Sequence, residues 1–274
     1  MDYSELPWNF EAFRRFIDYK TLQKAASVLC LFDGRKVIGS PRDLEEFQTT
    51  LDSRTGLEWL PDRNVSDDIL FNVEGNVFRN KARVFSSFFL LNPKLMESTG
   101  CIVTTKFGKA LGWGFIPEQE FYNTIVMKFQ YPHPVYDENW SAWNDANVKL
   151  KPFLFILQIL YKLHQIDKNH DWVSVKEFAE FAHSNPFHEK AGEIAQNIYN
   201  SRINEQVISR ERTDRIERKI GDIFGFLCMT GLCYYIDSNI KLNLVKKSNQ
   251  ENVYFYEKRN QESRLEEINS LINI

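Results

Sequence analysis

Apolar residues recur at intervals of three and four positions through much of the chain, which is the spacing that places them on one face of an α-helix. In the first third this pattern predicts helices over residues 8–30, 41–55 and 79–91. The second helix has a clear beginning, because Ser40 is a capping residue type and Pro41 lacks an N–H that a first turn would leave unbonded. It is expected to end near Gly56.

Short apolar pieces separated by turn-prone residues predict hairpins between the helices. Leu95–Met96 and Cys101–Val103 flank the polar residues 97–100, so we expect a hairpin there. A further short helix is expected to open at Thr104–Gly108.

The second half repeats the order of helices followed by a hairpin. Ser174 and Glu177 have the spacing of a capping box, which predicts a helix over residues 175–183. Two apolar pieces, 232–236 and 240–245, flank Asp237-Ser238-Asn239 and predict the second hairpin. The remaining helices of this half are expected over residues 118–130, 152–164, 189–206 and 210–229.

Helices followed by a two-stranded hairpin have the order of a winged helix, and this order occurs twice. We therefore predict a mainly α fold with short β-hairpins, arranged as tandem winged-helix domains. The first domain is expected over residues 1–117 and the second over residues 151–274, joined by a linker over 118–150. No repeat of fixed short period is present, which excludes a solenoid.

Composition places the chain among ordinary globular proteins. Of 274 residues, 43% are hydrophobic and 26% charged, so a disordered or fibrous class is excluded. No apolar run approaches the roughly 20 residues that span a bilayer, and the first residues do not form a secretory signal. The four cysteines lack metal-ligand spacing, which favours plain core cysteines in a reducing compartment. We expect a cytoplasmic protein with no membrane partner.

Catalytic motifs are missing from the sequence. It contains none of the common phosphate-binding, dinucleotide-binding, serine-hydrolase or zinc-protease patterns, and its five histidines are scattered. We therefore predict no catalytic residue, no metal ligand and no cofactor. Glu257-Lys258, after the apolar piece 253–256, is the nearest local candidate for a Mg²⁺-dependent nuclease centre, but a partner acid on a neighbouring strand is not identifiable.

Charge is unevenly distributed, although the formal net charge is only −3. Residues 41–75 carry nine acids and three bases, whereas residues 79–109 carry six bases and one acid. A helix that enters the major groove needs donors for phosphates and for purine edges, together with short polar residues. The helix over 79–91 and its hairpin supply such groups: Arg79, Asn80, Lys81, Arg83, Ser86, Lys94 and Ser98.

The second half holds a weaker basic stripe. Arg212, Arg215 and Lys219 share one face of the predicted helix over 210–229, opposite its apolar face. Residues 201–219 contain six bases and four acids, so paired charges on a solvated helix are an alternative explanation. The same alternative, a solvated basic face whose aliphatic stems cover the core, applies to residues 79–109.

Several short motifs follow one another along the chain: T-x-x-G-x-x-L within 103–111, K-x-Q-Y-P at 128–132 and a proline-led apolar helix at 151–157. Phe226, the T-G-L turn at 230–232 and residues 242–243 follow later. In their order and spacing these motifs resemble the recognition region of AlwI-type restriction endonucleases and their nicking relatives, where the last three correspond to a helix end, a turn and a wing strand. The resemblance covers roughly residues 95–245.

The resemblance implies winged-helix-like subdomains that bind a short asymmetric duplex site, with cleavage by a separate domain of the PD-(D/E)xK type. The expected function is therefore sequence-specific recognition of double-stranded DNA in a bacterial restriction or anti-phage defence system. Cleavage would come from another domain or subunit, and a nuclease or an AAA+ motor is the expected protein partner. The alternatives are a compact Mg²⁺-dependent nuclease and a winged-helix scaffold for protein interactions.

Overall fold

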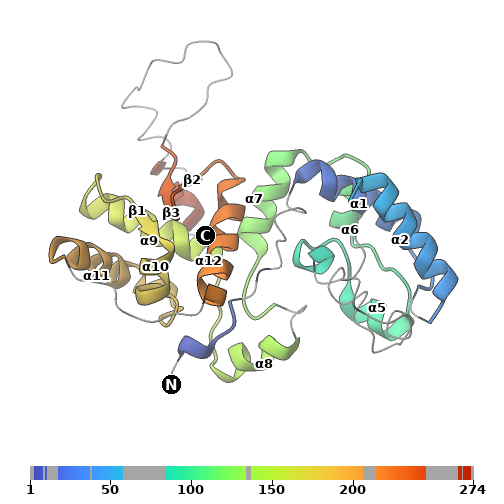
Figure 1. The fold of residues 1–274 in the computed structure, drawn as a ribbon, viewed down its shortest axis with the longest axis horizontal. Coiled ribbons are helices and arrows are strands. Elements are labelled where there is room, and N and C mark those ends of the chain that lie inside the picture. The colour runs from blue at the N-terminus through green and yellow to red at the C-terminus, as the bar shows by residue number, and fades with distance from the viewer. Residues whose placement is uncertain are drawn as a thin grey trace, which may run out of the picture. The chain divides into compact units, whose positions relative to one another are not determined.

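Local capping signals mark the beginning of some helices and the end of others. The computed structural model describes residues 3–8, 10, 18–37, 39–57, 84–133, 137–205, 214–244, 265–266 and 268–272. Within these ranges the fold is mainly helical, with one antiparallel sheet of three strands (Figure 1). The mainly α fold with short strands is thus confirmed.

Two compact units divide the chain. The C-terminal unit comprises Met1–Phe10, Tyr122–His133 and Asp137–Ile274, and the N-terminal unit comprises Glu11–Phe121 and Pro134–Tyr136. The domain boundaries proposed at residues 117 and 150 stay a prediction. The predicted linker contains α7 (Glu118–Lys128) and α8 (Asp137–Asp145).

The N-terminal unit is built around α1 (Tyr19–Leu31), α2 (Pro41–Thr55) and α6 (Lys106–Gly112). Helix α2 begins after Ser40 and ends at Gly56, whose φ of 71° suits glycine, as the sequence predicts. Helices α1 and α6 pack closely, because a Cβ at Gly112 would lie 2.8 Å from the backbone of Ala26. The Thr104 hydroxyl also donates to the Leu29 carbonyl at 2.9 Å.

The hairpin predicted around residues 95–103 is wrong. Residues Pro93–Thr99 form helix α5, and the chain becomes extended only after Gly100. The Asn92 side chain accepts from the Leu95 amide at 3.2 Å, and Gly100 at φ 72° ends the helix. Asn-Pro before the segment and glycine after it are helix boundary signals, and they outweigh the turn propensity of residues 97–99.

The helix predicted over 79–91 ends earlier than residue 91. Residues 84–87 are helical, and the chain leaves the helix at Phe89, which has a φ of 58°. Ser86, which the sequence predicts among the DNA-contacting groups of this helix and so on its outward face, is instead buried and only 3% exposed. Residues 79–83 lie outside the described part of the chain.

The C-terminal unit carries the sheet. Its elements are α9 (Pro152–Ile166), β1 (Trp172–Ser174), α10 (Val175–Glu177), the π-helix η2 (Phe178–Ala182), the 3₁₀ turn η3 (His188–Lys190), α11 (Ala191–Ile203), α12 (Asp214–Cys228), β2 (Cys233–Ile236) and β3 (Asn239–Leu242). The strand order is β1-β3-β2, so the predicted second hairpin is confirmed and a third strand is added to it. The capping box at Ser174 and Glu177 is also confirmed.

An aromatic core holds the N-terminal segment inside the C-terminal unit. Trp8 is 1% exposed and lies 6.0 Å, ring to ring, from Tyr131 and 5.5 Å from Phe178. The indole N–H of Trp143 donates to the Pro7 carbonyl at 3.1 Å. Residues far apart in sequence therefore form one core, in which the 3₁₀ turn η1 (Tyr3–Glu5) leads directly into Trp8.

We expect the Trp8→Ala substitution to lower the free energy of unfolding by about 3–5 kcal/mol, because it leaves a large cavity among aromatic rings. Urea denaturation followed by circular dichroism measures the change. Trp113→Ala is the matched control, since Trp113 is 61% exposed and its loss should change stability by no more than about 0.5 kcal/mol. Equal effects of the two substitutions would contradict the packing assigned to Trp8.

Acid should destabilise the fold through His133. Burial lowers the pKa of this residue to about 4, whereas an exposed histidine titrates near 6.5. Between these two pKa values the unfolded chain binds a proton on His133 that the native state does not bind. The free energy of unfolding therefore falls as pH drops from about 6.5 to about 4. We expect His133→Phe to flatten this fall by at most about 3 kcal/mol in urea titrations across that range. An unchanged pH profile would rule out a titrating His133 as a cause.

Candidate nucleic-acid interface

Helix α12 and the β2–β3 hairpin that follows it form the candidate interface of the C-terminal unit. The residues Ile220, Ile223, Phe224 and Leu227 are buried, which fixes the helical face that packs on the core. Arg218 is exposed on another face. The hydroxyl of Tyr235, on β2, would lie 3.5 Å from a Cβ at Gly221, so the hairpin lies alongside the helix.

The hairpin, which we call the wing, turns through Asp237 and Ser238. Their φ values of 51° and 64° are those of a two-residue turn with both central residues left-handed, the kind that matches strand twist. Ile236 pairs with Asn239 directly before and after the turn. The wing exposes apolar side chains as well, with Ile236 at 57% and Tyr234 at 38%.

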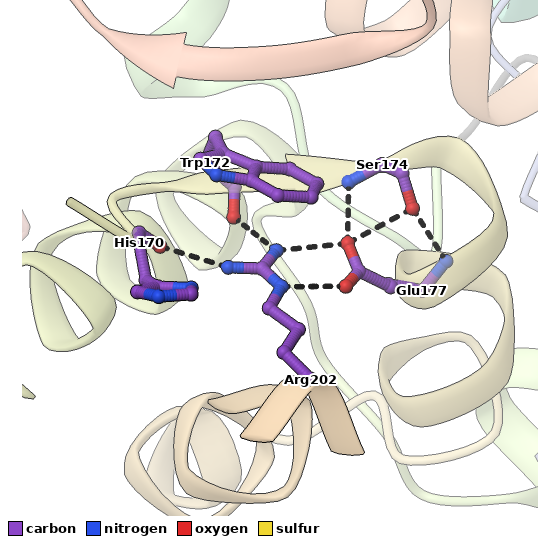
Figure 2. A network of polar contacts seen from close by, with 5 residues as sticks. All are labelled: His170, Trp172, Ser174, Glu177 and Arg202. Atoms are coloured by element: carbon purple, nitrogen blue, oxygen red, sulfur yellow. Dashed lines mark hydrogen bonds and ion pairs between the residues drawn. The ribbon is translucent and has the colours of Figure 1, made fainter. Parts of the chain in front are cut away.

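A buried ion pair fixes the strand on which the wing rests (Figure 2). Arg202, near the end of α11, donates from Nε to Glu177 Oε1 at 2.7 Å and from Nη2 to Oε2 at 2.8 Å. The two side chains are 10% and 6% exposed. The same guanidinium donates to the carbonyls of His170, at 3.0 Å, and Trp172, at 2.6 Å, and lies 3.6 Å over the Trp172 ring.

The Glu177 carboxylate also accepts the hydrogen bonds of the capping box. Its Oε2 accepts from the amide and the hydroxyl of Ser174, both at 2.9 Å, as Figure 2 shows. The Glu177 amide donates back to the Ser174 hydroxyl at 3.1 Å. One carboxylate therefore joins α10, α11 and β1. Arg202 is thus a structural cation, although it belongs to the base-rich segment 201–219.

A second ion pair connects the wing to the other end of β1. Lys241 Nζ, on β3, lies 2.9 Å from Asp171 Oδ1, and Asp171 Oδ2 lies 3.1 Å from His164 Nδ1. The Asp171 side chain is only 4% exposed. Hydrogen bonding to Asp171 raises the pKa of Lys241 above its ordinary value, although burial acts in the opposite direction. The ammonium is therefore charged at neutral pH and paired within the protein.

The proposed contacts of the N-terminal unit are distributed differently from the sequence prediction. Lys94 and Ser98 are exposed on α5, so they belong to a helix and not to a wing. Ser98 donates to the Leu95 carbonyl at 3.0 Å. Four of the predicted residues lie outside the described residues: Arg79, Asn80, Lys81 and Arg83.

The second basic stripe is only partly described. Lys219 is half-buried on α12, and Arg215 belongs to the same helix, with its side chain outside the described part. Arg212 precedes the described helix. The sequence prediction for this surface omits the exposed Arg218 on α12 and the exposed Lys176 at the beginning of α10. The i, i+3 spacing of Arg215 and Arg218 was the available signal for the first of these.

Sulfur and carboxylate groups do not assemble into a metal site in the described ranges. Groups of three or more metal-ligating side chains are absent there, and the four cysteines are all free thiols. Glu257 and Lys258, the residues of the nuclease alternative, lie outside those ranges. Among the helices described, none has the length and apolarity that a bilayer crossing needs.

The residues that carry the sequence resemblance have structural tasks. Gly108 packs against the backbone of Leu90, because a Cβ there would overlap the Leu90 carbonyl oxygen. The Thr105 hydroxyl caps α6 by accepting from the Gly108 amide at 2.9 Å. Thr230 donates to the Leu227 carbonyl at 2.6 Å, and Asn243 closes the wing by donating to the Gly231 carbonyl at 3.0 Å. The resemblance therefore concerns the scaffold.

Comparisons with known proteins agree on one family. The family described as "Restriction endonuclease BpuJI - N terminal" matches residues 117–273. A crystal structure of the BpuJ1 endonuclease binding domain in complex with pyrene- and phenanthrene-modified DNA superposes with a TM-score of 0.60 at 13% identity. The alignment covers 92% of this chain and 91% of that one, which establishes a common fold. No curated protein matches the sequence significantly.

We expect Glu177→Gln and Arg202→Met each to cost about 3–5 kcal/mol of stability, because each leaves a buried charge without its partner. The double substitution should cost less than the sum by about 0.5–3 kcal/mol, since it removes both charges. Urea denaturation of the four proteins completes the cycle. Strict additivity would show that the two groups do not depend on each other.

Proposed function

The chain belongs to the family of the N-terminal part of restriction endonuclease BpuJI, and on that basis we propose that it is a DNA-recognition module of a restriction system. The observation that carries the proposal is the family match over residues 117–273. It is supported by the fold shared along nearly the whole chain with a binding domain solved on DNA. In this role the chain reads a duplex site, and cleavage comes from another domain or subunit.

Tandem winged helices are the proposed architecture of the module. In the C-terminal unit the order α9, β1, α10, α12, β2, β3 and the strand order β1-β3-β2 support a winged helix with α11 inserted. In the N-terminal unit the described helices α1, α2 and α6 form the helical part. We also propose a nearer relationship to AlwI-type recognition regions. The proposed protein partner is a nuclease or an AAA+ motor, and the proposed location is the cytoplasm.

Helix α12 is the proposed groove helix of the C-terminal unit. A recognition helix places donors at base edges while the neighbouring elements hold the phosphates. Arg212, Arg215 and Lys219 are the proposed contacts of this helix, and the exposed Arg218 joins them. In the N-terminal unit the proposed contacts are Arg79, Asn80, Lys81 and Arg83, together with Lys94 and Ser98 on α5.

We expect the purified chain to bind duplex DNA with an affinity that falls steeply as salt rises, despite its formal net charge of −3. Each phosphate contact releases counterions, so Arg218→Ala should flatten the slope of log K against log salt by about 0.9. Fluorescence anisotropy with a labelled duplex measures both quantities. Lys162→Ala is the control, because Lys162 is exposed on α9 and bonded to Gln165.

Two outcomes would redirect the assignment, the first from this titration and the second from incubation of the chain with duplex DNA and Mg²⁺. Absence of duplex binding at low salt would contradict DNA recognition and favour the scaffold alternative. Strand cleavage that requires Mg²⁺ and is lost in Glu257→Gln would favour the nuclease alternative.

A further inference from the structure

The wing carries little positive charge for an element that is proposed to lie beside DNA. Its described residues, Cys233–Leu242, include one cation, Lys241, and one acid, Asp237. Lys241 is paired with Asp171, whose side chain is 4% exposed and also meets His164. The positive charge of the wing is therefore neutralised within the protein.

Asp237, the acid of the wing, lies in the turn at its tip. Asp237 is exposed, and among the residues the structure describes no cation pairs with its carboxylate. The turn is held on both sides, since the Val175 amide donates to the Ser238 carbonyl at 3.0 Å and Asn239 Nδ2 donates to the Asp237 carbonyl at 3.1 Å. The turn, held in this way against the first residue of α10, presents an exposed carboxylate at the tip of the wing.

A carboxylate in this position is compatible with contacts to base edges but not with contacts to phosphates. Phosphates repel it, whereas the exocyclic amino groups of bases donate to it, as in the contact of Asp or Glu with cytosine N4. Phosphate contacts position a protein and base contacts specify a sequence, so such a carboxylate adds specificity at the expense of general affinity.

We propose that the wing reads a base edge, with Asp237 as a specificity-determining residue that accepts a hydrogen bond from a base amino group and disfavours other DNA. This inference rests on the proposed function, because it assumes that the α12 face meets DNA. It differs from that function in assigning the wing to sequence reading and not to backbone binding.

A turn at positive φ also favours aspartate for conformational reasons, so the test separates charge from conformation. Asp237→Asn keeps a residue type that tolerates this backbone and removes only the charge, whereas Asp237→Gly also removes the acceptor. The cognate duplex is first obtained by selection from a random library with the wild-type chain. Anisotropy titrations then compare the cognate duplex with a scrambled one for each protein.

We expect Asp237→Asn to bind the scrambled duplex more tightly than wild type, because a carboxylate no longer opposes the phosphates. Asp237→Gly should lose preference at one base pair, so that discrimination there falls roughly five- to a hundredfold. Repeating the selection with Asp237→Gly identifies which amino-bearing base is read, cytosine, adenine or guanine. Glu205→Gln is the control, since Glu205 is also exposed and has a positive φ of 49° but lies after α11.

The proposal fails if both Asp237 variants retain the wild-type preference at every position. It also fails if Glu205→Gln tightens binding to the scrambled duplex as much as Asp237→Asn does, because the effect is then one of net charge. A wild-type chain that binds no duplex contradicts the proposed function itself, which distinguishes the two failures.

Discussion

The buried pair of Arg202 and Glu177 is the constraint on which the C-terminal unit depends. Burying two charges is costly unless the geometry is good and the remaining polar atoms are bonded. Here the guanidinium meets the carboxylate with two hydrogen bonds and also holds the carbonyls of His170 and Trp172. The pair thereby fixes β1, with which β3 pairs, and so fixes the wing beside α12.

The same pair shows why counts of charged residues overstate a DNA-binding surface. Arg202 contributes to the base-rich segment 201–219 but is buried. In the N-terminal unit Lys109 contributes to the basic segment 79–109, yet its Nζ lies 2.6 Å from Asp33 Oδ2. Lys241 is likewise paired with Asp171. Cations that stabilise the fold in this way have little capacity left for phosphates, so a smaller exposed set carries the proposed recognition.

Long-range packing has a comparable role in the core of the C-terminal unit. Trp8 lies among aromatic rings from residues more than a hundred positions later, including Tyr131 and Phe155. The N-terminal segment therefore belongs to the unit that carries the wing. A domain assignment that follows chain order places this segment in the other half, because no local pattern indicates where an isolated tryptophan is buried.

The sequence by itself determined the features that depend on hydrogen bonds between neighbouring residues. The end of α2 at Gly56, the capping box of Ser174 and Glu177, and the turn at Asp237 are of this kind. The same local signals are present for α5, although the turn propensity of residues 97–99 predicts a hairpin there. Of the candidate interface, the sequence located α12 and the wing hairpin.

Tertiary structure decided which charged and aromatic residues are buried. The burial of Arg202 and Ser86, the pairing of Lys241 and the position of Trp8 all depend on contacts with distant segments. A periodic pattern records which face of a helix is apolar but not which segment covers it. For this reason the sequence could indicate where helices and turns form, whereas only the packed chain decided which of its charges remain exposed.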